Sequence, residues 1–174
     1  MFCGFKRLIS LLAAFAREGW YAWCSGASTQ NGYACAKAQE SYNAPMPILG
    51  HGIDIVETAR IRKLVEEHGE HFLHRVFTAD EQAYCAGNGK RYYEHLAGRF
   101  AAKEAVLKVL GTGWRGGIAW TDIEIVKDVS GQPRVKLTGE CARIARETGI
   151  SRWHVSISHI ETHATASAIG MRGE

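Results

Sequence analysis

The sequence has too few cysteines, too irregularly spaced, for a disulfide-stabilised scaffold. It contains five, namely Cys3, Cys24, Cys35, Cys85 and Cys141, and no Cys-x-x-Cys pair occurs. An odd number without paired spacing argues against a disulfide framework and against a zinc site made of cysteines. Three of the five lie within the first 45 residues. This usage is typical of a protein of the reducing cytoplasm.

Long apolar runs and a large excess of charge are also missing. No apolar stretch approaches the ~20 residues that a membrane-spanning helix needs. The net charge of +3 over 174 residues is too small to indicate a nucleic-acid partner. With 46% hydrophobic and 22% charged residues, the composition is that of an ordinary globular protein. The length favours one domain with an appendage, and no internal repeat is visible.

The appendage is the segment of residues 1–45. Lys6 and Arg7 precede a short apolar run over residues 8–16, which is the order found in a secretory signal. Arg17 and Glu18 follow at once, and no small-residue cleavage site is visible there. Secretion and an organelle transit peptide are therefore both disfavoured. We expect a leader that is non-native or disordered, followed by a domain over residues 46–174.

Hydrophobic periodicity predicts four helices in this domain. They cover residues 58–68, a short segment that starts at the capping box of residues 78–81, residues 90–110 and residues 139–148. Gly69 and Gly111 are expected to end the first and the third of these helices.

Strands are predicted at both ends of the domain and in a hairpin between them. They cover residues 48–56, 122–128, 134–138, 153–158 and 164–169. The first is short, apolar and β-branched, which predicts a buried strand with Asp54 inside it. The fold class is therefore α+β, with an antiparallel sheet and helices on one of its faces.

Side chains suited to chemistry gather on the helix of residues 90–110. Glu104 and Lys108 are four residues apart and share one face, which can hold a metal with the carboxylate and a phosphate with the amine. A plain amphipathic helix with a Glu–Lys pair has the same spacing. Asp54 in an apolar strand is costly unless it is paired or bound to a metal, or lies at the strand end and faces water. Spacing alone leaves these interpretations open.

Several short motifs decide between these interpretations of Asp54, Glu104 and Lys108. They are GIDIVE at residues 52–57, GRFAAKEA at 98–105, GTG at 111–113, DIEI at 122–125, GQP at 131–133 and WHVSISH at 153–159. In this order they resemble the holo-acyl-carrier-protein synthases, the small 4′-phosphopantetheinyl transferases. The GRFAAKEA match is nearly complete and highly specific. The resemblance covers residues 47 to 170 and leaves out the first 45 residues, so Met46 is where such an enzyme would normally begin.

The resemblance implies a Mg²⁺-dependent transfer of 4′-phosphopantetheine from coenzyme A to a serine of apo-acyl carrier protein, in fatty acid biosynthesis. It implies that Asp54 and Glu104 bind the metal and that Lys108 contacts the pyrophosphate, with all three acting in catalysis. The family's arrangement also implies an acidic carrier protein that docks on Arg60. It implies a homotrimer in the cytoplasm, without nucleic-acid or membrane partners.

The remaining candidate residues would contact coenzyme A. They are Lys90, Arg91, Lys108, Gly111, Thr112, Gly113 and His159. Lys90 and Arg91 at a helix start suit phosphates, and the glycines permit close approach of a ligand. Solvated surface charges would account for Lys90 and Arg91 nearly as well. His159 is either a nucleotide contact or a structural strand-end histidine.

Several questions stay open on the sequence alone. The serine proton could pass to Glu104 directly or to a metal-bound water steered by Asp54. A non-catalytic coenzyme A binder would retain the same fold, although the presence of Asp54, Glu104 and Lys108 argues against it. The preferred carrier protein is not readable from one sequence. His68, His71 and His74 are spaced by three, but a solvated helix explains them better than zinc.

Overall fold

The computed structural model describes residues 47–114 and 117–173. The predicted leader of residues 1–45 therefore lies outside the described residues. In chain order the elements are β1 (Ile48–Glu57), α3 (Thr58–Val76), α4 (Ala79–Ala86), the 3₁₀ turn η1 (Gly89–Arg91), α5 (Tyr92–Leu110), the 3₁₀ turn η2 (Trp120–Asp122), β2 (Ile123–Lys127), β3 (Pro133–Leu137), α6 (Gly139–Glu147), β4 (Arg152–His159) and β5 (His163–Met171).

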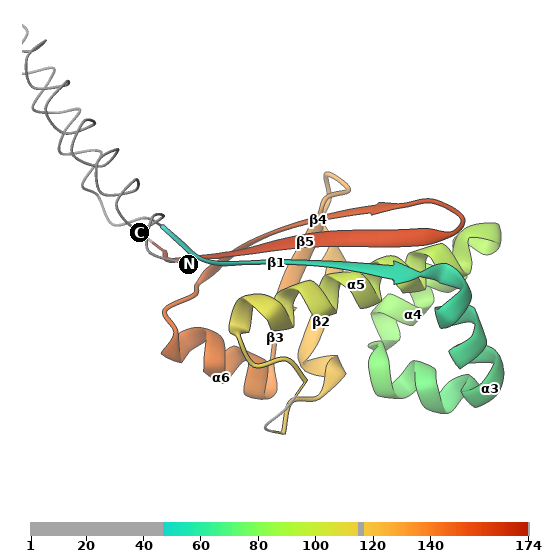
Figure 1. Ribbon diagram of the computed structural model, residues 1–174, viewed down its shortest axis with the longest axis horizontal. Coiled ribbons are helices and arrows are strands. Elements are labelled where there is room, and N and C mark those ends of the chain that lie inside the picture. Colours follow the sequence, from blue (N-terminus) through green and yellow to red (C-terminus); the bar gives the residue numbers. More distant parts are fainter. Residues whose placement is uncertain (1–46, 115–116, 174) are drawn as a thin grey trace, which may run out of the picture. The chain divides into compact units, whose positions relative to one another are not determined.

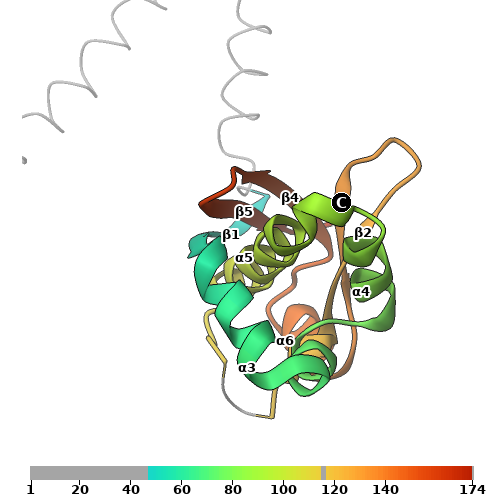
Figure 2. The same ribbon diagram turned by 90° about the vertical axis from the view of Figure 1, so that its right-hand side faces the viewer.

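The predicted α+β class is confirmed, and its antiparallel strands form two sheets (Figure 1). One sheet has the order β1-β5-β4, with Ala166 of β5 opposite both Asp54 and Ile157. The other is the hairpin of β2 and β3. Figure 2 shows that α3, α4, α5 and α6 lie on the same side of the three-stranded sheet. The hairpin forms because Gly131 adopts a positive φ of 88° in the connecting turn.

The central helix α5 packs directly on the three-stranded sheet (Figure 1). The sheet presents small residues to it, including the fully buried Ala164, Ala166 and Ala168 of β5. At Gly52 a Cβ would lie only 2.1 Å from the backbone oxygen of Ala105, so no larger residue fits without moving the helix. This contact places β1, and with it Asp54, against α5.

The expectation of a buried first strand was wrong for one face of β1. Ile53 is 59% exposed and Ile55 is 68% exposed, whereas Gly52 and Val56 are buried. Alternate residues of a strand point to opposite faces, and the described helices cover only one face of this sheet. An apolar β-branched run in sequence cannot show that half of its side chains face outward.

Helix α3 also extends beyond Gly69, which was expected to end it. Gly69 adopts φ 53° and ψ −135°, yet it kinks α3 instead of ending it, and the helix continues to Val76. Leu73 and Val76 of the second half are buried in the core. Their burial stabilises the extension, and a local capping rule cannot register such tertiary packing.

The central helix α5 begins at Tyr92, two residues later than predicted. Lys90 and Arg91 belong to η1, where Gly89 has a positive φ of 50°. The capping box at Thr78 and Glu81, the left-handed Gly111 that ends α5, and the hairpin are all confirmed within a residue or two. Among the described residues, no helix has both the length and the apolar character to cross a membrane.

Candidate functional site

The predicted catalytic residues meet where β1 runs beside α5. Lys108 Nζ lies 2.9 Å from Asp54 Oδ1 and donates a second hydrogen bond of 2.6 Å to the backbone oxygen of Ile53. The Asp54 side chain is 19% exposed and the Lys108 side chain 49%. The pair is open enough for a ligand phosphate to reach the ammonium group.

Glu104 lies one helical turn before Lys108 and is partly buried. Burial, and secondly the negative charge of Asp54, raise the pKa of Glu104, whereas the charges of Lys108 and Arg60 lower it. Two carboxylates that repel one another at a partly exposed site have the donor chemistry that a hard divalent cation prefers. Asp54 and Glu104 therefore fit the predicted role of Mg²⁺ ligands.

The glycine turn follows the last residue of α5. Gly111 and Gly113 have positive φ values of 72° and 57°, and no atom lies within 4 Å of where a Cβ would stand. The Gly111 N–H donates to the backbone oxygen of Lys108, which closes the helix. The turn thus lies three to five residues beyond Lys108 with room for a ligand beside its backbone.

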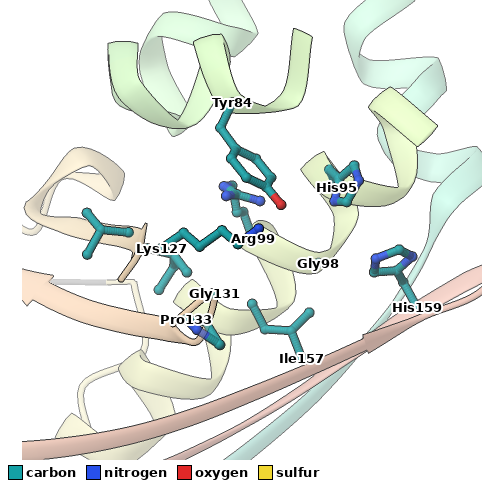
Figure 3. A pocket seen from close by; sticks show the side chains of 11 residues that line it. Tyr84, His95, Gly98, Arg99, Lys127, Gly131, Pro133, Ile157 and His159 are labelled. Atoms are coloured by element: carbon teal, nitrogen blue, oxygen red, sulfur yellow. The ribbon is translucent and has the colours of Figure 1, made fainter. Parts of the chain in front are cut away.

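A second site is a cavity of about 230 Å³ between α4, α5, β2 and β4 (Figure 3). Four basic side chains line it, namely His95, Arg99, Lys127 and His159. None of the described residues that line it carries a carboxylate. The cavity is therefore suited to an anion.

Arg99 is the most buried of these basic residues, with 7% of its surface exposed. Its guanidinium lies 3.9 Å from the centre of the Tyr84 ring, and Lys127 lies 5.7 Å from the same centre. Arg99 Nε is buried and has no hydrogen-bond partner among the described residues. An unpaired buried N–H is costly, so a ligand acceptor would relieve this cost.

The sequence offered His159 as either a nucleotide contact or a structural histidine, and its three basic neighbours were missed. His159 Nδ1 lies 2.9 Å from Glu94 Oε2, and its ring centroid is 4.9 Å from that of His95. Arg99 stands inside the GRFAAKEA motif, among residues of α5 that are mostly buried. The sequence signal that could have identified it was an arginine within this motif. His95 and Lys127 offered none, because only the fold brings α5 and β2 together.

The other predicted contacts are more dispersed. Lys90 and Arg91 are exposed on η1 and are not among the residues that line the cavity. The positive charge of Arg91 nevertheless contributes to lowering the pKa of His95, after burial and the charges of His159 and Arg99, so Arg91 lies near the cavity. The structure does not bring Lys90 or Arg91 into contact with Asp54 or Glu104 through any described interaction.

Arg60 is exposed on α3, and its positive charge lowers the pKa of Glu104. The other basic residues of α3 interact with aromatic rings or with a carboxylate of the protein itself. Arg62 lies 4.7 Å from the ring centre of Tyr93, Arg75 lies 5.7 Å from that of Trp114, and Lys63 pairs with Glu67 at 3.7 Å. The histidines of α3 are exposed, and His74 pairs with Glu70.

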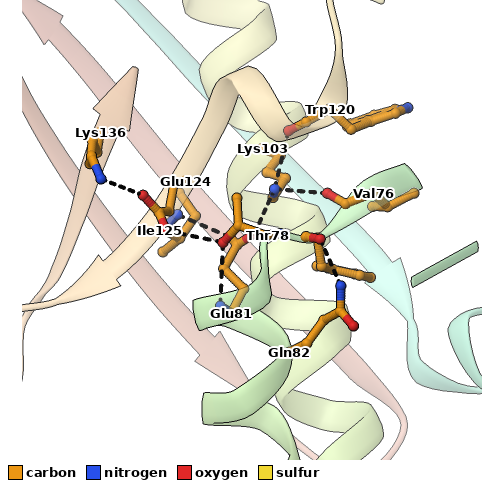
Figure 4. A network of polar contacts seen from close by, with 10 residues as sticks. Val76, Thr78, Glu81, Gln82, Lys103, Trp120, Glu124, Ile125 and Lys136 are labelled. Carbon is orange, nitrogen blue, oxygen red and sulfur yellow. Dashed lines mark hydrogen bonds and ion pairs between the residues drawn. The ribbon is translucent and has the colours of Figure 1, made fainter. Parts of the chain in front are cut away.

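A buried polar network supports α5 between the two sites (Figure 4). Lys103 is fully buried, and its Nζ lies 2.7 Å from Glu81 Oε2, 2.8 Å from the Val76 oxygen and 3.1 Å from the Trp120 oxygen. Glu81 Oε1 accepts the N–H of Ile125 at 3.0 Å. The network ties α4 and β2 to the helix that carries Glu104.

Comparisons with known proteins identify the family to which the sequence is similar. The model of the 4′-phosphopantetheinyl transferase superfamily matches residues 50–168. A holo-[acyl-carrier-protein] synthase of Koribacter versatilis is 44% identical over 70% of this chain and 97% of its own length. The corresponding protein of Halothermothrix orenii is 47% identical over 72% of this chain and 99% of its own.

Solved structures are similar as well. The synthase of Neisseria meningitidis superposes with a TM-score of 0.66 and 36% identity, covering 72% of this chain and 99% of that one. The synthase of Helicobacter pylori in complex with coenzyme A gives a TM-score of 0.61 and 32% identity, covering 69% and 98%.

Loss of the buried ammonium should destabilise the fold. Lys103→Met leaves the Glu81 carboxylate buried without its partner, so we expect the free energy of unfolding to fall by about 3–5 kcal/mol. Urea denaturation followed by circular dichroism measures it. Lys63→Met, which breaks the exposed pair with Glu67, is the control and should cost less than about 1 kcal/mol. Equal effects of the two changes would contradict a structural role for the network.

Asp54→Asn should lower the pKa of Glu104. The substitution removes the charge that raises this pKa and leaves the opposing charges of Lys108 and Arg60 in place. Carbon-13 NMR of the glutamate carboxyl resonances across a pH titration would measure the change. An unchanged or higher pKa of Glu104 would show that the two carboxylates do not interact.

Proposed function

The chain belongs to the holo-[acyl-carrier-protein] synthases of the 4′-phosphopantetheinyl transferase superfamily, and we propose that it transfers 4′-phosphopantetheine from coenzyme A to a serine of apo-acyl carrier protein. The observation that carries this proposal is the cluster of Asp54, Glu104 and Lys108, which the contact of β1 with α5 brings together within the family's motifs. The products are holo-carrier protein and adenosine 3′,5′-bisphosphate.

Asp54 and Glu104 would hold Mg²⁺, because their mutual repulsion makes the pair favourable only with a cation nearby. When bound, Mg²⁺ neutralises the pyrophosphate and stabilises the negative charge of the departing phosphate. Lys108 pairs with Asp54. A pyrophosphate oxygen is a second acceptor for its ammonium group, which would orient the substrate for attack.

The reaction is an in-line displacement at phosphorus. The serine oxygen bonds to the β-phosphorus of coenzyme A, and the bond from that phosphorus to the bridging oxygen of the pyrophosphate breaks. Adenosine 3′,5′-bisphosphate leaves with that oxygen. The serine proton passes either to Glu104 or to a water molecule that Asp54 orients. The raised pKa of Glu104 favours a carboxylate that accepts a proton.

The basic cavity would take the nucleotide end of coenzyme A. Its support is the concentration of Arg99, Lys127 and His159 around a space of about 230 Å³, together with the unpaired Arg99 Nε. A phosphate oxygen accepts strongly from a guanidinium and removes the cost of that unpaired N–H.

A homotrimer would bury the uncovered face of the three-stranded sheet. Ile53 and Ile55 are exposed side by side on that face of β1, which supports an interface there. Cys85 and Cys141 are buried as free thiols, which supports a location in the reducing cytoplasm. A role in fatty acid biosynthesis rests on the family resemblance alone.

Mass spectrometry of the carrier protein tests the function. Incubated with coenzyme A, Mg²⁺ and the protein, the apo-carrier should gain the mass of one phosphopantetheine. Asp54→Ala and Glu104→Ala should each slow this gain about 100-fold or more while circular dichroism stays unchanged. Wild-type rates in both variants would refute the assignment of these residues. Binding of coenzyme A without any mass gain would instead indicate a non-catalytic binder.

Arg60→Glu should impair use of the carrier protein and spare coenzyme A. The exposed arginine would face an acidic carrier, so reversing its charge should lower kcat/KM for the carrier about tenfold. Added salt should narrow the difference from wild type. Steady-state kinetics with each substrate varied in turn measure both effects.

The assay needs a pH near 8, because the Arg60 charge also lowers the pKa of Glu104 and this carboxyl should be ionised in both proteins. Arg146→Glu, a matched reversal on the exposed side of α6, is the control and should leave both substrates unaffected. An effect of Arg60→Glu on coenzyme A alone would move Arg60 from the docking face to the nucleotide site.

A further inference from the structure

Two histidines stand side by side at one end of the basic cavity, and they come from different elements (Figure 3). His95 belongs to α5 and His159 ends β4, and their ring centroids are 4.9 Å apart at an interplanar angle of 70°. Tyr84 of α4 contacts His95 on another side, with ring centroids 5.5 Å apart. The position of His95 is thus determined by neighbours on two other elements.

The Glu94 carboxylate interacts with both histidines. Glu94 Oε2 lies 2.9 Å from His159 Nδ1, and its charge also acts on His95. The other charged groups that face His95 are cationic. They are Arg99 of α5 and Arg91 of η1, with Lys127 of β2 on the same cavity wall.

A protonated His95 would therefore be repelled in the protein without ligand. The negative charge of Glu94 stands against the fixed positive charges of Arg99 and Arg91, and His159 competes for the same Glu94. A phosphate in the cavity would reverse this balance, because it adds up to two negative charges and further acceptor oxygens. It would favour the charged imidazole, which then donates a hydrogen bond.

We propose that His95 makes the phosphate site at Arg99 and His159 a proton-linked receptor: His95 takes up a proton when a phosphate monoester binds beside Arg99. The inference rests on the proposed function in one respect: the monoester is the 3′-phosphate, which coenzyme A and adenosine 3′,5′-bisphosphate both carry. His95 is thereby a ligand-binding residue, and phosphate affinity depends on pH through a group outside the catalytic cluster.

The direction of the pH dependence follows from the pKa of His95. Burial, and then the charges of His159 and Arg99, lower this pKa below the ordinary value of 6.5, so His95 is neutral at neutral pH without ligand. Bound phosphate raises it. Affinity therefore increases as the pH falls through the bound-state pKa, and the increase ends below the lower pKa of the protein without ligand.

Titration calorimetry with adenosine 3′,5′-bisphosphate tests the proposal directly. The heat is measured near pH 7 in several buffers of different ionisation enthalpy, which gives the number of protons taken up. We expect net uptake by the wild-type protein. We also expect Kd to fall about three- to tenfold between about pH 8 and pH 7, since one linked proton gives at most tenfold per pH unit. The range stays above the second phosphate pKa of about 6.

His95→Gln should abolish most of the proton uptake and flatten the pH dependence. His95→Phe retains an aromatic ring against Tyr84 and His159, so it should give the same result with the local packing preserved. His71→Gln, at an exposed position on α3, is the matched control and should behave as wild type. Dephospho-coenzyme A, which lacks the monoester, should bind without uptake that depends on His95.

The outcomes separate this inference from the proposed function. If adenosine 3′,5′-bisphosphate and coenzyme A bind but proton uptake is absent, or is unchanged in His95→Gln and His95→Phe, the proton-linked receptor is refuted and the transferase assignment stands. Undiminished His95-dependent uptake with dephospho-coenzyme A refutes the assignment to the monoester. Failure of both coenzyme A and the bisphosphate to bind refutes the inference and the proposed function together.

Discussion

The close packing of α5 against the three-stranded sheet is the constraint on which both sites depend. Glycines permit it: a Cβ at Gly52 would lie 2.1 Å from the Ala105 oxygen, one at Gly98 would lie 2.9 Å from Ile157 Cγ2, and one at Gly170 would lie 2.6 Å from Val109 Cγ1. Asp54 follows the first contact by two residues and meets Lys108 there. Arg99 follows the second directly, and His159 lies two residues beyond Ile157. The functional side chains are thus the immediate neighbours of two of the positions where helix and sheet approach each other closely.

The two sites have opposite electrostatic character. At one, Asp54 and Glu104 repel each other and a single ammonium, Lys108, offsets them incompletely, which favours a cation. At the other, Arg99 and Lys127 flank Tyr84 without a carboxylate on the described lining, which favours an anion. Coenzyme A carries a pyrophosphate and a separate phosphate, so under the proposed function a cation-assisted site and a purely basic site would take different parts of the same substrate.

Between these sites the buried Lys103 stabilises the helix that carries both. Burial lowers its pKa, and the charge and hydrogen bond of Glu81 oppose this effect. Because Lys103 is adjacent to Glu104 and one turn after Arg99, its contacts with Glu81, Val76 and Trp120 restrict rotation of α5 about its axis. A purely apolar side chain at this position would fill the space without such directional restraint.

The sequence by itself determined the fold class, most of the element order and the identity of the residues at the carboxylate cluster. Those conclusions depend on local patterns: periodicity, the Thr78 capping box, the glycine after Leu110, and motifs that resemble a known family. Tertiary structure decided what local patterns cannot contain. It extended α3 beyond Gly69 through burial of Leu73 and Val76, and it left Ile53 and Ile55 exposed. It also brought His95, Arg99 and Lys127 around His159, because residues from three separate elements become neighbours only when α5 packs on the sheet and the hairpin folds beside it.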